Sequence, residues 1–152
     1  QIEIDFLNSC CFEQKFWTRT KHLILNECNN RLRPIPINRE LLKNFTHLQI
    51  LDLRSNRIES IENGALDWLR NLKELNLSDN LLRIIRNDQF KELRKCELLN
   101  LDENRIEFLQ DFSFSNMKCL KSLSIYGNRL NRINANMLNG LENLQILDMG
   151  YN

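Results

Sequence analysis

Few residues of this chain have the types and spacing that catalysis requires. His22 and His47 are the two histidines, and neither stands in a pattern that pairs it with a nucleophile. The sequence contains no glycine-rich phosphate loop and no His/Cys spacing typical of a metal site. The acids Asp102 and Glu103 would attract a cation only weakly, because adjacent strand residues point to opposite sides unless a turn intervenes. We therefore predict a non-catalytic protein with no metal and no cofactor.

Two Asn-x-Ser/Thr triplets indicate a different chemistry, the attachment of glycans. They are Asn44-Phe45-Thr46 and Asn76-Leu77-Ser78. Such acceptor sequences are used in secreted proteins, so they support an extracellular location. The net charge of +1 argues against steering to nucleic acid. No apolar run approaches the length of a membrane span.

A repeat of fixed period sets the elements that position these side chains. The pattern Leu-x-x-Leu-x-Leu-x-x-Asn-x-Leu returns every 24 residues. Its leucines alternate with period two, which predicts a short strand with the leucines on one face and the residue between them facing outward. The asparagine of the pattern is predicted to bond backbone groups of its own turn and of a neighbouring turn. The five copies begin at Leu48, Leu72, Cys96, Leu120 and Leu144.

This pattern resembles the leucine-rich repeat family over roughly residues 20 to 152. The period resembles that of the typical extracellular subtype, found in Toll-like receptors, small proteoglycans and insect immune proteins. The resemblance implies an α/β solenoid: a right-handed horseshoe with a parallel concave sheet and an irregular or short-helical convex side. We expect an N-terminal cap with the first strand over residues 1–29, and repeats over 30–152 with the last one incomplete.

The first copy is irregular and leaves two registers open. Cys28 matches the asparagine column when counted from Leu25, whereas Asn30 matches it when counted from Ile35. Residues 1 to 19 match no repeat, but Ile2 and Ile4 begin an alternating pattern typical of a strand, which we place in a capping hairpin.

The cysteines near the N-terminus resemble the disulfide-bonded caps of secreted repeat proteins. A bond from Cys11 or Cys10 to Cys28 would close a loop of about 17 residues and contribute roughly 3 kcal/mol. The alternative is that Cys28 remains a thiol in the asparagine column. Cys96 occupies a core leucine column and is expected to be buried, whereas Cys119 is expected to face solvent and is a candidate for cross-linking to another chain.

The outward residues of the repeats are where a partner would bind. The middle of the predicted concave face is acidic and its C-terminal end is aromatic, and exposed Tyr is typical of protein interfaces. We predict a protein or peptide site on this face or its flank. The alternative is a solvated polar face, and a glycan on Asn76 would cover part of the site. The predicted binding residues are Asp79, Asp102, Glu103, Tyr126 and Tyr151.

These expectations favour a recognition module, the N-terminal part of a secreted or cell-surface protein of innate immunity. The alternative is an adhesion or extracellular-matrix scaffold in which the repeats serve as a spacer.

The chain stops inside a copy of the repeat, at Asn152, which indicates a fragment. Its last strand would then leave Leu144, Leu147 and Met149 uncovered. Because an open sheet edge with exposed leucines is a template for pairing, we predict a homodimer that joins these edges antiparallel about a two-fold axis.

Overall fold

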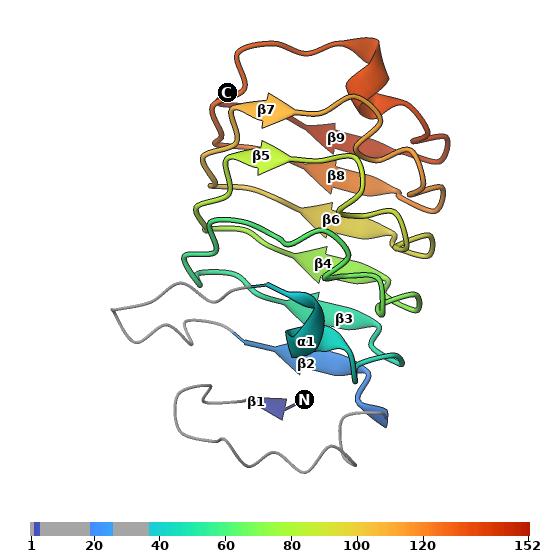
Figure 1. The fold of residues 1–152 in the computed structure, drawn as a ribbon. Helices are drawn as coiled ribbons and strands as arrows, with labels where there is room; N and C mark the ends of the chain where they lie inside the picture. The colour runs from blue at the N-terminus through green and yellow to red at the C-terminus, as the bar shows by residue number, and fades with distance from the viewer. Residues whose placement is uncertain (1, 4–18, 26–36) are drawn as a thin grey trace.

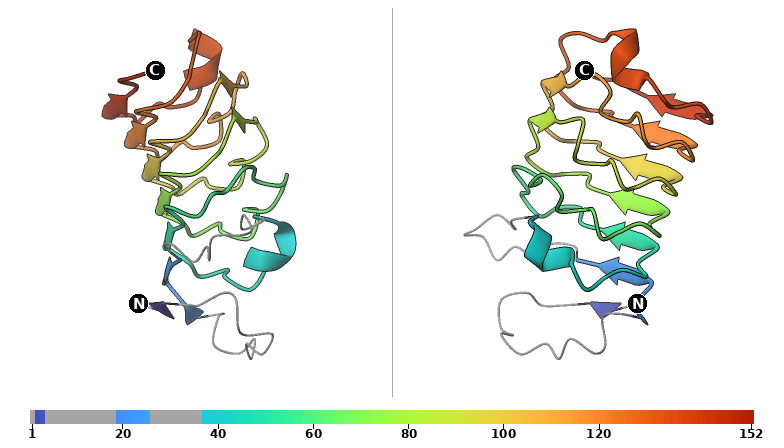
Figure 2. Two further views of the ribbon diagram at one scale, coloured as in Figure 1. Left: turned by 90° about the vertical axis from the view of Figure 1, so that its left-hand side faces the viewer. Right: turned by 45° about the vertical axis from the view of Figure 1, so that its right-hand side comes forward.

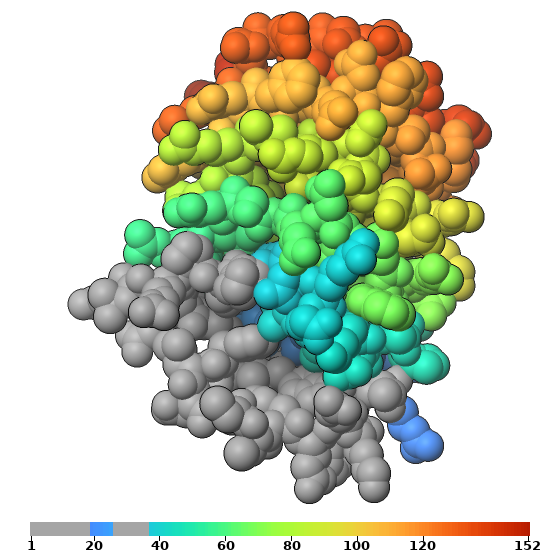
Figure 3. All heavy atoms as spheres, in the orientation of Figure 1, coloured from blue at the N-terminus to red at the C-terminus, as the bar shows by residue number. Residues whose placement is uncertain are grey.

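The chain folds as a solenoid in which each repeat makes one coil (Figure 1). The computed structural model describes residues 2–3, 19–25 and 37–152. Figure 2 shows the long sheet along one side of the coils, and the short helices on the other. In the view of Figure 3 the successive coils lie directly on one another as layers. Each coil is thus packed mainly against its two neighbours in sequence.

One side of the solenoid is a seven-stranded parallel sheet with the order β1-β2-β3-β4-β6-β8-β9. The register aligns equivalent positions of every repeat, so that Leu51 lies beside Leu75 and Leu75 beside Leu99. The strands are short because only the Leu-x-Leu step is extended. Their bounds are β1 Ile2–Glu3, β2 His22–Ile24, β3 Ile50–Asp52, β4 Glu74–Asn76, β6 Leu98–Asn100, β8 Ser122–Ser124 and β9 Ile146–Asp148.

The other side carries short elements and turns. They are α1 (Arg39–Leu42), the 3-10 helix η2 (Ala135–Leu138), and the two-stranded parallel sheet of β5 (Ile84–Ile85) and β7 (Phe108–Leu109). The aromatic rings of Phe90 and Phe114 stack beneath these turns, with centroids 6.0 Å apart. The predicted parallel sheet and irregular or short-helical opposite side are confirmed.

The leucine columns of the sequence form the core. Side chains at the inward positions of successive coils are buried together in one continuous hydrophobic cluster. Cys96 lies in that cluster, as its place in a leucine column predicted. The equivalent columns include Leu51, Leu75, Leu99 and Leu123 on the strands, and Leu66, Phe90 and Phe114 on the opposite side.

The asparagines form a buried ladder that joins each coil to the next. The amide nitrogen of Asn104 donates to the carbonyl of Leu101 in its own turn, at 3.1 Å, and to that of Leu77 in the preceding coil, at 2.9 Å. Its amide oxygen accepts from the backbone N–H of Leu82 at 3.1 Å. Asn56, Asn80, Asn128 and Asn152 make the same kind of bonds, which confirms the predicted role of the column.

The strand β1 pairs parallel with β2, whereas a hairpin would pair antiparallel. Ile133 occupies the position of the buried Ile85 and Leu109 but is 54% exposed, since no further coil covers it in the described chain. The Cys11–Cys28 disulfide, with its alternative partner Cys10, lies outside the described residues and stays a prediction. Within the described residues, no helix is long and apolar enough to cross a membrane.

Candidate functional site

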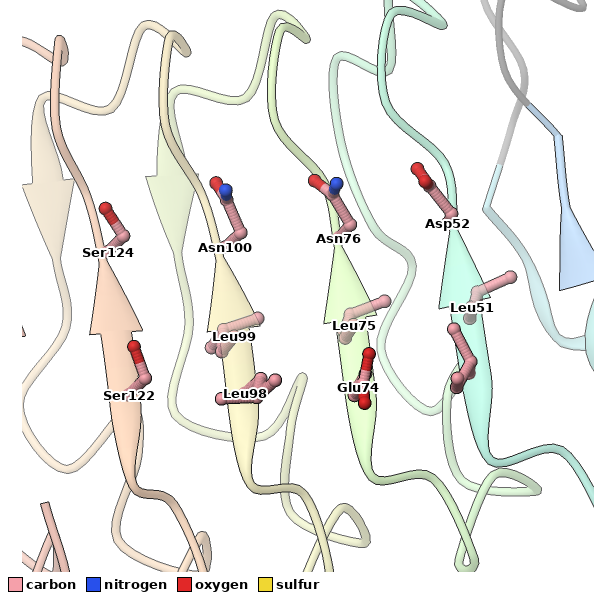
Figure 4. Close-up of a pocket in the computed structure, with 11 residues that line it drawn as sticks. Leu51, Asp52, Glu74, Leu75, Asn76, Leu98, Leu99, Asn100, Ser122 and Ser124 are labelled. Atoms are coloured by element: carbon pink, nitrogen blue, oxygen red, sulfur yellow. The ribbon is translucent and has the colours of Figure 1, made fainter. Parts of the chain in front are cut away.

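The face of the seven-stranded sheet that points away from the core is open, and we call it the sheet face. Strands β3, β4, β6 and β8 present a row of outward side chains on it, as Figure 4 shows. The first outward column contains His22, Ile50, Glu74, Leu98, Ser122 and Ile146, and the second contains Ile24, Asp52, Asn76, Asn100, Ser124 and Asp148.

A shallow hollow of about 310 Å³ lies on this face across β3, β4, β6 and β8. Apolar side chains stand beside it: Leu98 is 44% exposed, and Ile146 on the neighbouring edge strand is 60% exposed. Sequence reasoning missed these residues because it selected outward positions by charge and aromatic character. The signal that could have found them is an apolar residue directly before the Leu-x-Leu step. The sheet face therefore offers apolar as well as polar contacts.

Four residues of the second outward column form a turn at the end of their strand. In each of them a side-chain oxygen accepts a hydrogen bond from the backbone N–H two residues later, which is an Asx turn. The N···O distances lie between 2.8 and 3.1 Å. The residues that make this bond are Asp52, Asn76, Asn100 and Asp148.

The fourth coil departs from this rule, and Asp102 compensates. Ser124 stands where the coils of β3, β4, β6 and β9 have Asp or Asn, and in the described chain it makes no such bond to the N–H of Tyr126. The Asp102 carboxylate in the preceding coil instead accepts from that N–H at 2.8 Å, and from the hydroxyl of Ser124. Asp102, predicted from sequence as a partner-binding residue, thus has two partners within its own chain.

A column of left-handed residues follows the strands. In each coil the residue before the ladder asparagine has φ between 50° and 65°. This region favours Gly, Asn and Asp, because Cβ crowds the backbone there. No sequence pattern indicates this column, since its side chains vary widely. The column consists of Ser55, Asp79, Glu103, Gly127 and Tyr151.

The two tyrosines predicted as binding residues meet at the C-terminal end of the sheet face. Their ring centroids are 5.2 Å apart with planes tilted by 53°. Tyr151 is 82% exposed and Tyr126 is half-buried. Glu103 and Asp102 stand one coil away from Tyr126, and Asp79 one coil further, its N–H bonded to the Asp102 carbonyl at 2.9 Å. The structure therefore brings all five predicted residues into one strip along the strand ends.

The two glycosylation candidates lie at half-buried positions. Asn44 is in the turn after α1. Asn76 points outward from β4 into the row of Figure 4, and its amide oxygen accepts from the hydroxyl of Ser78 at 2.8 Å. No hydrogen bond holds the amide nitrogen of Asn76 within the described chain, so that nitrogen is open on the sheet face.

The two described cysteines differ in environment. Cys96 is buried, and burial raises the pKa of its thiol from 9.0 to about 12. Cys119 is exposed, as expected. Nearby, an ion pair and hydrogen bond with Lys121 lowers the pKa of Glu97 and raises that of the lysine. Over the described residues, no group of His, Cys, Asp and Glu side chains is placed to hold a metal ion.

At the C-terminal end, β9 pairs with β8 alone in the described chain. Leu147 is 42% exposed, whereas its equivalents in the inner strands are buried. Leu144 and Met149 are half-buried against the core. The predicted self-association residues are therefore more exposed than their counterparts in the inner coils.

Comparison with known proteins agrees with the coil architecture. A family model described as leucine rich repeat matches residues 46–106 and 97–152. No curated protein sequence matches the chain. The chain is similar to 161 chains of solved structures. One is a leucine-rich repeat protein of Leptospira interrogans, with a TM-score of 0.70 and 27% identity, over 86% of this chain and 31% of that chain. The present sequence thus spans less than a third of that protein's length.

Proposed function

Because this chain belongs to the leucine-rich repeat family, we propose that it binds a partner protein through the sheet face. Leucine-rich repeat domains are generally non-catalytic scaffolds and typically protein-binding modules. The single observation that supports this site is the open sheet face itself. It offers a hollow, exposed apolar side chains and a polar row on a backbone made rigid by the asparagine ladder.

A rigid face of this composition suits protein recognition. Its backbone is held by the parallel pairing of the strands, so binding should cost little further backbone entropy. Leu98 supplies apolar area at the centre, while Glu74 and Ser122 beside it supply polar contacts. A mixture of an apolar centre and a polar rim is typical of protein interfaces.

Two matched double variants test the proposal. Leu98→Arg with Ser122→Arg places two bulky cations at neighbouring outward positions of the sheet face. Ile84→Arg with Ser60→Arg does the same on the opposite flank, where Ile84 is 41% exposed compared with 44% for Leu98. In a pull-down, the partner proteins that the unmodified chain captures should no longer bind to the first variant and should still bind to the second. If the first variant retains every partner, the sheet face is not the binding site.

We further propose that the protein is extracellular and takes part in innate immune recognition. The resemblance of its repeat period to that of Toll-like receptors supports this proposal, as do the two acceptor triplets. A glycan on Asn76 would stand beside the hollow, so partners would then bind nearer the C-terminal coils. Removal of N-glycans from the secreted protein should lower its mass at Asn44 and Asn76, and unmodified asparagines at both sites would argue against the extracellular proposal.

A further inference from the structure

The tyrosines and glycines at the C-terminal end of the sheet face alternate. Residues 126–127 read Tyr-Gly and residues 150–151 read Gly-Tyr, so each coil contributes one aromatic ring and one position without a side chain. A Cβ on Gly150 would lie 3.2 Å from the Tyr126 ring and 3.3 Å from an oxygen of Asp148. A Cβ on Gly127 would lie 2.7 Å from the Glu103 carboxylate. We call these residues and the two carboxylates the tyrosine patch.

Tyr151 has a left-handed backbone conformation that a tyrosine rarely adopts. Each of the five coils from β3 to β9 has a left-handed residue here, with φ of 53° for Tyr151, and the other four use Ser55, Asp79, Glu103 and Gly127. A bulky residue in this conformation is strained, and such exceptions gather at functional sites. The ring of Tyr151 lies beside that of Tyr126, with centroids 5.2 Å apart. The side chain therefore adds a second aromatic ring at this end of the sheet face.

The charge of the patch is negative. The segments 100–104, 124–128 and 148–152 contain three carboxylates and neither Lys nor Arg. Asp102 is engaged by Ser124 and Tyr126, but no cation pairs with Glu103 or Asp148 anywhere in the described chain. Two aromatic rings with negative faces thus lie beside two carboxylates that lack a counter-charge.

We propose that the tyrosine patch binds a positively charged Lys or Arg side chain from an extended segment of the partner protein. The ring faces attract a cation, and more so when water is excluded. The free carboxylates supply the ion pair, whereas an anionic or purely apolar partner would leave them desolvated and unpaired. The chain already places the Arg132 guanidinium 5.1 Å above the Phe108 ring, a contact of the same kind. This inference rests on the proposed function, since it names the chemistry of the partner at one end of the same face.

The chain offers a clean reporter, because Tyr126 and Tyr151 are its only tyrosines. The tyrosine rings are labelled for NMR, and tetramethylammonium chloride is titrated into the protein. Sodium chloride at the same ionic strength is the control. A ten-residue peptide with four arginines is then compared with the same peptide carrying citrulline, which keeps the shape but not the charge. We expect saturable shifts of both rings with tetramethylammonium and with the arginine peptide, and none with sodium or citrulline.

Substitutions separate cation binding from apolar contact. Tyr151→Leu and Tyr126→Leu should each weaken arginine-peptide binding by about fivefold, while Tyr151→Phe, which keeps the ring face, should change it less than about twofold. Glu103→Gln should weaken binding by about threefold, and the matched control Glu62→Gln, an exposed acid away from the sheet face, should not. Equal binding of the citrulline peptide, or unchanged affinity in Tyr151→Leu, overturns the proposal.

The two proposals fail in different ways. If partners are lost with Leu98→Arg/Ser122→Arg but the arginine peptide does not bind, the sheet face is the binding site and the preference for a cation is wrong. If the arginine peptide binds but partners are insensitive to that double variant, the tyrosine patch is a cation site and the wider face is not the interface.

Discussion

Asp102 shows how a residue that looks like part of an interface can serve the fold. In three inner coils the strand ends with Asp or Asn, whose oxygen accepts the N–H two residues on. Ser124 does not make this bond, so the acceptor for Tyr126 comes from Asp102 in the coil before. A carboxylate with two donors is less available to a partner than Glu103 or Asp79.

Loss of Asp102 should therefore destabilise the chain, and a local acceptor should rescue it. Asp102→Ala leaves the Tyr126 N–H without its partner, which costs about 1–2 kcal/mol of unfolding free energy in urea denaturation. Adding Ser124→Asn restores the Asx turn in the same coil and should recover most of that loss. Glu62→Ala, at an exposed acid outside the left-handed column, is the control and should cost less than about 0.5 kcal/mol. A double variant as unstable as Asp102→Ala would contradict this account.

The two described thiols should react at very different rates. Burial raises the pKa of Cys96 to about 12, so almost no thiolate forms at pH 8 and the thiol stays unreactive in the folded state. Cys119 is exposed and should be alkylated by iodoacetamide. The raised pKa also means that the contribution of Cys96 to stability is fully present below pH 9 and is lost as the pH rises toward 12. Peptide mapping of the alkylated protein checks the difference, and equal labelling of both residues would show the core to be open.

At the scale of the element, the asparagine ladder is what closes each turn. The Asn104 side chain makes bonds within its own turn, to Leu101, and to the preceding coil, to Leu77 and Leu82, through groups that are otherwise buried. Each coil is therefore held by hydrogen bonds as well as by its apolar columns. Replacing one rung leaves several backbone groups unsatisfied at once.

Asn104→Ala should consequently lower the free energy of unfolding by about 3 kcal/mol, because buried carbonyl and N–H groups lose their partners. The matched control is Asn71→Ala, which removes two exposed bonds, one to the Thr46 carbonyl and one from the Lys95 amine, and should cost less than about 1 kcal/mol. Urea denaturation of both variants measures the difference. Similar losses for the two asparagines would mean that the ladder adds no more than a surface hydrogen bond.

The elements could be predicted from the sequence where the same residue type recurs at the same position of every repeat. The inward leucines and ladder asparagines recur, so their columns, the parallel sheet and the burial of Cys96 followed from the sequence. The left-handed column did not, because Ser55, Glu103 and Tyr151 share no side-chain chemistry and only the backbone is common to them. The exposed Leu98 was missed for a different reason: outward positions were selected by charge and aromatic character, although its place directly before the Leu-x-Leu step marks it as outward.

At the scale of the whole molecule, each coil depends on its neighbours for burial. Leu123 in β8 is covered on both sides, whereas Leu147 in β9 is 42% exposed and Ile133 on the opposite side is 54% exposed. The same residue types thus differ in burial according to the number of adjoining coils. This dependence is general in solenoids, whose stability is a sum of coil and interface contributions.

The 152-residue chain should accordingly associate through β9. Pairing two such edges antiparallel about a two-fold axis would cover a few hundred Å² of apolar surface. This is a gross gain of several kcal/mol at roughly 25 cal/mol per Å², partly offset by the cost of association.

We expect the sedimentation mass to rise toward that of a dimer from low to high micromolar concentration. Ile146→Lys, at an outward side chain that is 60% exposed, and Leu147→Lys should keep the chain monomeric, because lysine blunts an edge strand. Ile84→Lys, exposed to a similar degree on the other sheet, should leave association unchanged. A monomer at every concentration would refute the prediction, and dissociation by Ile84→Lys alone would assign the contact to the β5–β7 flank.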